Sequence, residues 1–346
     1  MSRRRAGLPR ERAFWVLLGT LVLAGLAASF LGERPRRVRL TLVAALPAPR
    51  PQPGGRQWHA VRFSQIAFLP AKPGGVFVSP TLLRLGPTGD FYVLDSGASR
   101  IARISPDGRL LASYGPADLG NPSDVAIGSS GEVWVSDPDR RRITVFDAAG
   151  AVARRIVLDR PAFRLALTGN GGFVTTDPEP SPALFRLYTP AGSPLGAFGA
   201  FFPPPLQDAQ TTDGWIVATG PASFVYPLRH AGLLAAFTTD GRLLFIRHTI
   251  DAVPLPEARI DAGGNVSLDQ GDPLATLCGC AAGRELYLLS AATAPGARAL
   301  DVYDAATGGY RYSLAFPEAD SRCAAVSGDR LASASRRGVT VWRRAG

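Results

Sequence analysis

The 346-residue sequence has few of the side chains that catalysis and metal binding use most often. Its three histidines, His59, His230 and His248, do not have the spacing of metal ligands on one element. A Gly-x-Ser-x-Gly segment, which would mark the nucleophile of one class of hydrolase, does not occur in the sequence. The sequence therefore carries no motif for a histidine metal site or for a serine nucleophile on a strand-to-helix turn.

Charge is also scarce outside the N-terminal region. Charged residues make up 19% of the chain, whose net charge is +10. Eleven arginines and two glutamates lie in residues 1–56, so the 27 basic and 26 acidic residues beyond them nearly balance. That larger part shows no basic stripe interleaved with aromatic side chains, the pattern expected of a nucleic-acid surface. We therefore expect no nucleic-acid partner.

One long uncharged run stands behind the basic segment 1–12. Residues 13–31, AFWVLLGTLVLAGLAASFL, contain no charge, and 19 helical residues reach across a bilayer core of roughly 30 Å. We expect a transmembrane signal anchor that contacts the lipids of a bacterial-type inner membrane and places the rest of the chain on the periplasmic side. The alternative is a signal cleaved near Ala27 or Ala28, which would release a secreted protein. The Arg/Pro/Gly-rich residues 32–57 predict a semi-extended linker.

A repeated pattern occupies the rest of the chain. The motifs GDFYVLD, GEVWVSD and GGFVTTD place Gly89, Gly131 and Gly172 at nearly equal intervals of about 40 residues. A second set of turn glycines recurs with the same spacing: Gly108, Gly150 and Gly192. Two registers with the same period indicate a repeat architecture.

Each unit holds four short apolar runs separated by Gly-containing turns, which predicts four β-strands. A period of about 40 residues with four strands is typical of a β-propeller blade. Six units fit, so we predict an all-β, six-bladed β-propeller over residues 58–346, with seven blades as the alternative. The last unit lacks one strand. We expect residues 58–69 to supply it by pairing with residues 338–343, which would close the ring.

The units resemble NHL-type repeats of six-bladed propellers, most clearly in NPSDVAIGSSGEVWVSDPDRRRITVFDAAG, residues 121–150. The shared pattern places Pro122 at the start of the blade, Gly131 in the first hairpin, Asp137 after the second strand and Arg142 at the start of the third. The resemblance implies the propeller fold. The wider group of TolB-like and gluconolactonase-like propellers further implies, as an alternative function, a calcium-dependent hydrolase or lactonase with its site in the central channel.

Two sets of polar residues are candidates for chemistry in that channel. The gluconolactonase-like group holds calcium with Glu, Asn and Asp, and here Asn121 and Asp124 stand where channel-facing side chains begin. Asp95, Asp137 and Asp177 each end the second strand of a unit. Because they recur at the same place in different blades, the ring holds them apart. We expect each to accept hydrogen bonds from the turn that follows it.

The three cysteines occupy related positions. Cys278 and Cys280 form a C-x-C, and Cys278 and Cys323 each precede a first-hairpin glycine by five residues. They therefore lie at equivalent places on the inner strands of neighbouring blades. Either they are small buried residues, or Cys323 forms a disulfide with Cys278 or Cys280, which export would permit. A zinc site is the least favoured alternative, because structural zinc sites take four ligands.

A long connection between two units, residues 251–273, interrupts the repeat, and long loops often carry function. Part of it resembles a small hairpin or a fragment of a seventh blade. Four of its residues are candidate ligands of a calcium loop: Asp261, Asn265, Asp269 and Asp272. Val266 stands where an EF-hand turn requires glycine, which disfavours that loop.

A second interruption, residues 220–232, carries Phe224 and Tyr226, which we expect to be exposed as a contact surface. These features favour binding over catalysis. We expect a membrane-anchored, exported propeller that acts as a protein-binding scaffold or accessory subunit of a membrane or envelope complex. Its partners would be membrane or periplasmic proteins, and no cofactor is required beyond the calcium alternative. The other candidates are the hydrolase or lactonase and a small-molecule sensor.

Overall fold

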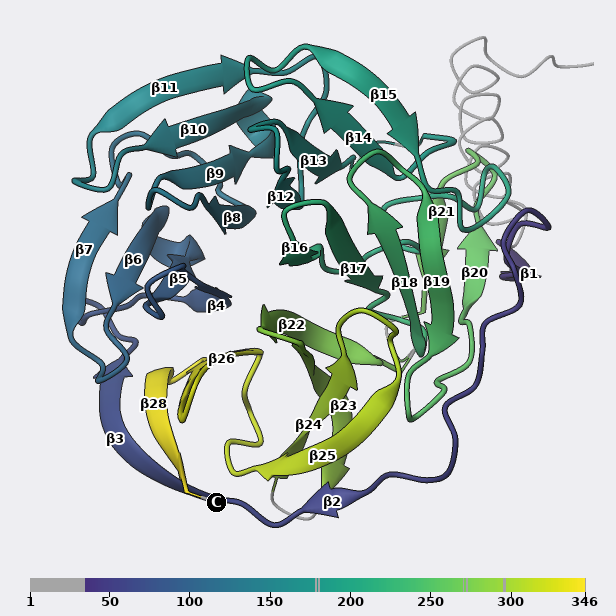
Figure 1. Ribbon diagram of the computed structural model, residues 1–346. Coiled ribbons are helices and arrows are strands. Elements are labelled where there is room, and N and C mark those ends of the chain that lie inside the picture. The colour runs from purple at the N-terminus through teal and green to yellow at the C-terminus, as the bar shows by residue number, and fades with distance from the viewer. Residues whose placement is uncertain are drawn as a thin grey trace, which may run out of the picture.

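Short antiparallel strands account for most of the regular structure. The structure is a computed structural model that describes residues 35–177, 179, 181–269, 271, 273–294 and 297–345. All of its sheets except one of three strands stand around a ring, each with its innermost strand toward the centre (Figure 1). The fold is therefore the all-β propeller that the repeat predicted. The expected anchor, residues 13–31, lies outside the described residues, among which no helix has the length and apolar character to cross a membrane.

Four sheets follow the chain in order, each with its innermost strand first. Sheet 1 contains β4 (Pro80–Leu85), β5 (Phe91–Asp95), β6 (Arg100–Ile104) and β7 (Leu110–Tyr114). Sheet 2 contains β8 (Asp124–Ile127), β9 (Val133–Asp137), β10 (Arg142–Phe146) and β11 (Val152–Val157). Sheet 3 contains β12 (Leu165–Leu167), β13 (Phe173–Thr176), β14 (Phe185–Tyr188) and β15 (Pro194–Phe198). Sheet 4 contains β16 (Val217–Gly220), β17 (Ser223–Pro227), β18 (Leu233–Thr238) and β19 (Leu243–His248).

Three further sheets include strands from the N-terminal region. Sheet 5 contains β22 (Thr276–Ala282), β23 (Glu285–Ala294), β24 (Ala297–Asp304), β25 (Tyr310–Phe316) and β2 (Trp58–His59). Sheet 6 contains β26 (Cys323–Ser327), β27 (Arg330–Ser335), β28 (Gly338–Ala345) and β3 (Arg62–Pro70). A three-stranded sheet contains β1 (Arg36–Arg39), β20 (Glu257–Ile260) and β21 (Val266–Leu268). Two 3-10 turns, η1 (Ser96–Ala98) and η2 (Pro138–Arg140), follow the second strands of sheets 1 and 2.

Aromatic side chains fill the spaces between neighbouring sheets. The ring of Tyr114 in sheet 1 meets Phe146 of sheet 2 edge-on, with centroids 5.9 Å apart, and Trp134 of sheet 2 lies 5.8 Å from Phe173 of sheet 3. Turn glycines allow the sheets to approach this closely. Gly108 has a φ of +84°, and a Cβ there would lie 2.3 Å from a Cβ of β3 in sheet 6.

The aspartates that end the second strands tie each sheet to the chain that enters it. Asp95 accepts hydrogen bonds from the backbone N–H of Ser79 at 2.7 Å, and Asp137 accepts one from Gly120 at 3.0 Å. Both donors precede the first strand of the same sheet. The expectation of bonds from the following turn is therefore wrong for Asp95, whereas Asp137 also accepts one from the side chain of Arg140 in that turn at 3.3 Å. The expectation holds for Asp177, which accepts the N–H of Glu179 at 2.9 Å.

Sheet 6 contains strands from both ends of the propeller region. β3 pairs antiparallel with β28 over residues 62–70 and 338–345. Trp58 and His59, which we expected in this closing strand, instead pair parallel with β25 of sheet 5. The imidazole of His59 stacks on the ring of Tyr312 with centroids 4.2 Å apart. That contact holds the two residues one sheet earlier than expected.

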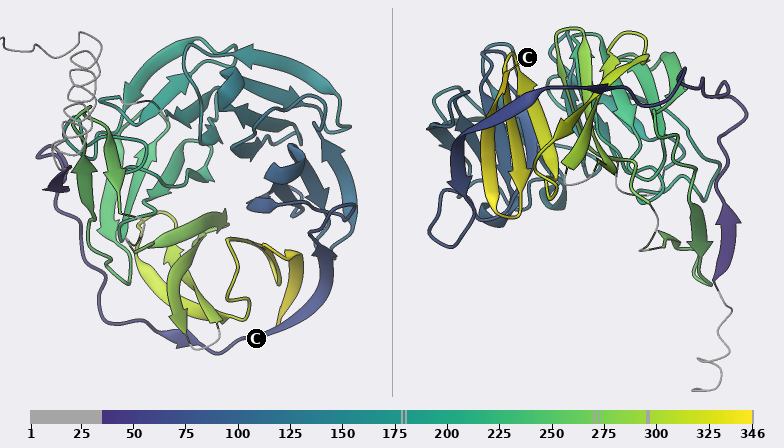
Figure 2. Two further views of the ribbon diagram at one scale, coloured as in Figure 1. Left: turned by 180° about the vertical axis from the view of Figure 1, so that it is seen from behind. Right: turned by 90° about the horizontal axis from the view of Figure 1, so that it is seen from below.

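Residues 36–59 form an extended segment, here called the N-terminal belt, which follows the outside of the ring (Figures 1 and 2). Its strand β1 pairs with β20, and Leu40 is only 2% exposed. Gln52 donates hydrogen bonds to the carbonyl oxygens of His248 and Gly308 at 2.8 and 2.9 Å. Arg56 forms ion pairs with two aspartates. These contacts attach the described part of the expected semi-extended linker, residues 35–57, to the ring.

The two predicted interruptions have different outcomes. Phe224 and Tyr226 lie on β17 inside the repeat, and each is 1% exposed. Both rings pack 5.0 Å from Phe185 of sheet 3, so the expected contact surface at residues 220–232 is wrong. Residues 251–273 do contain a hairpin, made by β20 and β21, to which β1 adds a third strand.

Candidate functional site

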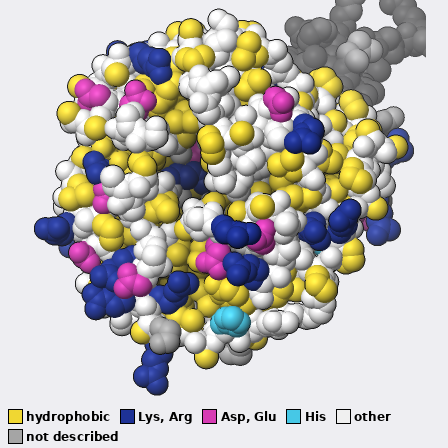
Figure 3. Space-filling view, in the orientation of Figure 1, with side chains coloured by type: hydrophobic (Ala, Val, Ile, Leu, Met, Phe, Trp, Pro, Cys, Tyr) yellow, Lys and Arg dark blue, Asp and Glu magenta, His cyan; other side chains and the backbone are white. Residues whose placement is uncertain are grey.

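The centre of the ring holds a cavity of about 470 Å³. Its wall comes from the innermost strands of sheets 1 to 5 and from the hairpins that follow some of them. Most wall residues are apolar or glycine, and the ionisable ones among the described residues are Arg84, Glu132 and Cys280. On the face shown in Figure 3, the histidine side chain that is visible lies at the lower rim, away from this centre.

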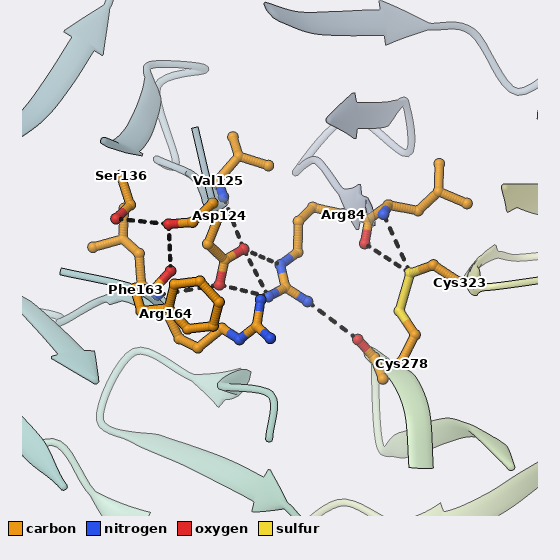
Figure 4. A network of polar contacts seen from close by, with 12 residues as sticks. Arg84, Asp124, Val125, Ser136, Phe163, Arg164, Cys278 and Cys323 are labelled. Carbon is orange, nitrogen blue, oxygen red and sulfur yellow. Dashed lines mark hydrogen bonds and ion pairs between the residues drawn. A yellow bond between two sulfur atoms is a disulfide. The ribbon is translucent and has the colours of Figure 1, made fainter. Parts of the chain in front are cut away.

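A buried ion pair crosses the channel beside this cavity (Figure 4). The Arg84 guanidinium donates to both carboxylate oxygens of Asp124, at 2.8 and 2.9 Å from Nη2. Its Nη1 also donates to the carbonyl oxygen of Gly279 at 3.3 Å. Asp124 is fully buried and accepts the backbone N–H of Leu165 at 3.1 Å. The pair therefore joins the inner strands of sheets 1, 2, 3 and 5.

Both charges of this pair are occupied by each other and by backbone groups. The carboxylate of Asp124 also accepts the N–H of Val125 at 2.8 Å, so it has four donors around it. Removing one partner of a buried pair leaves an uncompensated charge, which is strongly destabilising. We conclude that Arg84 and Asp124 hold the ring together and are not free for acid-base catalysis.

A disulfide lies next to the ion pair. Cys278 of β22 is bonded to Cys323 of β26, with Cα atoms 4.9 Å apart. The Sγ atom of Cys323 accepts the backbone N–H of Leu83 at 3.2 Å, which brings sheet 1 into the same contact. Cys280 is a free, buried thiol, and burial raises its pKa to about 11. A thiol with so high a pKa is a poor nucleophile at neutral pH.

A second arginine is buried near the channel. The guanidinium of Arg164 lies 3.9 Å from the ring centroid of Trp215 and donates to the carbonyl oxygen of Gly214 at 2.8 Å. It also pairs with Asp213 at 3.0 Å. These bonds join sheet 3 to the loop that precedes sheet 4. Arg164 is therefore another structural cation.

The structure does not bring the two predicted channel residues together. Asp124 lies in the centre, whereas Asn121 is exposed and donates from Nδ2 to Asp139 at 3.1 Å. Asn121 does not line the cavity. The backbone N–H of Asn121 is also held, by Asp137 at 3.2 Å. The expected Asn121 and Asp124 site is therefore wrong, because the two side chains point to different parts of the sheet.

The calcium loop is likewise not formed by the residues described. Asp261 accepts the N–H of Gly263 and the N–H and Nδ2 of Asn265 at 2.8 to 2.9 Å, which makes it the turn residue of the hairpin. Asp269 pairs with Arg37 and Arg259. Asp272 lies outside the described residues. Within the described residues, no three His, Cys, Asp or Glu side chains are arranged to hold a metal ion.

Arg84 is the central residue that sequence reasoning missed, although the repeat contains a signal for it. Cys278 and Cys323 lie five residues before their hairpin glycines, and Arg84 lies five residues before Gly89. The same count therefore places Arg84 on an inner strand with the two cysteines. A charged residue at a position shared with small buried residues indicates a buried partner, here Asp124.

Comparison with known proteins agrees with this fold. The chain is 35% identical over 79 residues to NHL repeat-containing protein 3 of Homo sapiens and 32% identical over 79 residues to that of Mus musculus. Each match covers 20% of this chain and 23% of the relative, so the chain spans about a quarter of the length of the curated relatives it matches. No protein-family model matches the chain.

Solved structures extend the likeness to most of the ring. Virginiamycin B lyase of Staphylococcus aureus superposes with a TM-score of 0.54 over 83% of this chain and 100% of the lyase, at 13% identity. A streptogramin B lyase structure gives a TM-score of 0.54 over 82% of this chain and 98% of its own, at 12% identity. At such identities the likeness concerns the fold alone. The chain has an NHL-like β-propeller fold.

Proposed function

We propose that the chain is an exported propeller, held at a membrane by residues 13–31, that acts as a scaffold or accessory subunit by binding a protein. One observation carries this proposal: Arg84 and Asp124, the charged pair at the centre of the ring, are fully engaged in joining sheets. The remaining ionisable groups of the cavity wall, Glu132 and the buried Cys280, do not form a catalytic set. Binding therefore accounts for the site better than catalysis.

We further propose six blades, formed by sheets 1 to 6. The three-stranded sheet of β1, β20 and β21 stands outside the ring and takes one strand from the N-terminal belt (Figure 2). Every sheet of the ring has one strand that faces the channel, and this three-stranded sheet has none. We interpret it as a brace for the belt, so it does not count as a seventh blade.

The belt supports attachment close to the membrane. Residues 36–39 are already paired to β20, so few residues separate the proposed anchor from the propeller. The disulfide between Cys278 and Cys323 is compatible with export, because such bonds persist in oxidising compartments. Both features favour a disc held beside a periplasmic membrane surface.

The cavity favours small-molecule sensing as a second candidate. A volume of about 470 Å³ is within the range of ligand pockets, and its wall is mainly apolar. A lyase activity is not favoured. One of the similar structures is described as a catalytically inactive histidine-to-alanine variant of virginiamycin B lyase, whereas the described wall of this cavity contains no histidine.

Co-purification with the anchor intact tests the binding proposal. The full chain is extracted in mild detergent from its own membranes, beside a version whose residues 13–31 are replaced by a cleavable signal. We expect a stoichiometric membrane or periplasmic protein with the full chain and less of it with the released version. Arg154 and Arg155 are exposed arginines on β11, the outer strand of sheet 2. Loss of the partner on Arg154→Glu with Arg155→Glu would place the contact on the rim. If no protein accompanies either version, the scaffold proposal is wrong.

A further inference from the structure

The ring shows in its own structure how its rim accepts an additional strand. Sheet 5 has a fifth strand, β2, which pairs parallel with β25 through Trp58 and His59. Side chains secure this short strand, since His59 stacks on Tyr312 and Arg56 forms an ion pair with Asp301. The outer strand of sheet 4 also carries a bridge, between Arg50 and β19. A strand pairing of two residues, combined with one ring contact and one ion pair, is therefore sufficient to hold a segment at the rim.

The outer strands of sheets 1 to 3 have no such cover. β7, β11 and β15 each end their sheet within the described part of the chain. An uncovered outer strand presents unpaired backbone N–H and C=O groups, which are a template for another strand. β3, the outer strand of sheet 6, also ends its sheet. Among these edges, β11 combines an exposed apolar side chain, an outward backbone donor and exposed positive charge.

Val157 at the end of β11 is 75% exposed, the highest value among the large exposed hydrophobic residues described. The backbone N–H of Leu158 donates inward to Arg141 at 2.7 Å. Because donors alternate along an antiparallel strand, the N–H of Val157 points outward. An apolar side chain and a free donor therefore stand together at this edge.

β11 also carries charge of one sign. Arg154 and Arg155 are both exposed, and the strand contains no acidic residue. Arg155 reaches Asp118 at 2.5 Å, whereas Arg154 lies over the ring of Trp134 at 4.5 Å and has no carboxylate partner within the described residues. Side chains two positions apart share a face of a strand, so Arg155 and Val157 point the same way.

We propose that β11 receives an extended segment of the partner protein as a fifth strand of sheet 2. The segment carries an acidic residue opposite Arg155 and an apolar residue opposite Val157, separated by one residue. This inference rests on the proposed binding function, and it names the chemistry of the partner. The contact that Arg56 and β2 make on sheet 5 combines strand pairing, one ring contact and one ion pair. At β11 the contact with Val157 would take the place of the ring contact.

Synthetic peptides test this pairing on the full-length protein in detergent. The probe is a labelled, end-capped TETVTETVT, in which acidic and apolar side chains share one face. TKTVTKTVT reverses the charge, and TTEVTTEVT keeps the composition but puts the two side chains on opposite faces. Fluorescence anisotropy should show the probe binding about tenfold more tightly than either control peptide. Equal binding of the probe and TTEVTTEVT would overturn the inference.

Variants of β11 locate the site. Val157→Pro removes the outward N–H, and Arg154→Glu with Arg155→Glu reverses the charge. We expect each change to weaken probe binding about tenfold or more. The matched control is Arg311→Glu, which alters an exposed arginine on β25, the strand that β2 already covers, and should leave binding unchanged. Thermal melting of each variant checks that the fold is kept.

Further outcomes separate this inference from the proposed function. Hydrogen exchange should slow at the β11 amides when the probe is bound, and protection elsewhere would contradict the site. If Val157→Asp changes the oligomeric state of the full chain, the edge is a contact between copies and the inference is wrong. If a membrane partner co-purifies equally well with all β11 variants, the binding function stands and the β11 site is wrong.

Discussion

The rim of the ring has two unlike halves. The outer strands of sheets 4 and 5 contact the N-terminal belt, while β7, β11 and β15 of sheets 1 to 3 carry no further strand among the described residues. Sheet 6 takes its outer strand, β3, from the same N-terminal region as the belt, and β3 itself carries no further strand. The uncovered strands also carry many of the exposed large hydrophobic residues: Leu110, Leu111, Val157 and Leu195. Exposed edges invite pairing, so the proposed β11 site depends on this difference between the two halves.

The centre of the ring joins the two halves. Arg84 and Asp124 belong to the uncovered half, and the bond from Arg84 to Gly279 reaches sheet 5 in the covered half. The disulfide joins the inner strands of sheets 5 and 6 beside this ion pair, and Cys323 accepts the backbone N–H of Leu83 in sheet 1. The halves therefore differ at the rim but share one central set of bonds.

The largest expected effect follows from breaking this central connection. Asp124→Ala leaves the Arg84 cation buried without its partner, and we expect a loss of about 3–5 kcal/mol in the free energy of unfolding. Urea denaturation followed by tryptophan fluorescence measures it. The control is the double variant Arg84→Met with Asp124→Leu, which should be much closer to wild type because no charge remains buried. A loss below about 1 kcal/mol for Asp124→Ala would contradict the central role.

Removing the disulfide should affect stability somewhat less. Cys278→Ala with Cys323→Ala is expected to lower the free energy of unfolding by about 2–4 kcal/mol, because the unfolded chain loses a cross-link that spans 45 residues. A reducing agent should lower the stability of wild type toward that of the double variant and leave the variant unchanged. Cys280→Ala serves as the control. If reduction does not change wild type, the bond does not contribute to joining sheets 5 and 6.

The belt contact predicts a pH dependence. Burial raises the pKa of Asp301 from 3.8 to about 6, although the ion pair with Arg56 acts in the opposite direction. The folded state therefore holds this proton more tightly than the unfolded state. The resulting stabilisation is complete below pH 3.8 and is lost as the pH rises through about 6. The loss is on the order of 2–3 kcal/mol.

The variant Asp301→Asn isolates this contribution. Other carboxylates titrate in the same range, so the quantity to measure is the difference in unfolding free energy between wild type and variant at pH 4 and at pH 7. We expect this difference to change with pH in favour of wild type at pH 4. A difference that is independent of pH would show that Asp301 has an ordinary pKa.

Matched arginine substitutions give the smallest effects and compare the two halves directly. Arg56→Ala in the belt removes the partner of buried Asp301 and should cost about 2 kcal/mol. Arg154→Ala on the uncovered β11 should change stability by less than about 0.5 kcal/mol, as surface substitutions usually do. Thermal and urea unfolding of both variants provide the comparison. Equal costs would mean that the rim halves do not differ in the way proposed.

Much of the fold could be predicted because turn glycines mark it in the sequence. Gly89 and Gly131 have a positive φ, and a Cβ on Gly172 would collide with the carbonyl oxygen of Tyr188. Glycine is therefore required in these hairpins, and the spacing between the glycines equals the number of residues in one repeat unit. Phe224 and Tyr226 were misplaced because the repeat loosens in sheet 4. An apolar run gives no sign of whether it faces solvent or a neighbouring sheet when its register is unknown.

The candidate site was less predictable. Asp124 was identified as channel-facing, but its partner Arg84 lies far away in the sequence and in another sheet. Asn121 was grouped with it because both residues stand at the start of the same repeat unit, where channel-facing side chains begin. The chain turns between Asn121 and Asp124, so Asn121 faces outward to Asp139. Pairing between side chains of different sheets depends on the closure of the ring, which no local pattern records.

The sequence by itself determined that groups of strands recur at a constant spacing, that Cys278 and Cys323 occupy equivalent inner-strand positions, and that the body is nearly neutral. These properties are local or periodic, and a periodic spacing can be recognised in the amino-acid sequence without the structure. Only the tertiary structure decided that the belt binds the rim, that Arg84 neutralises Asp124, and that β11 is left uncovered. Those outcomes depend on which surfaces meet when the sheets close into a ring, because burial and pairing arise between segments far apart in the chain.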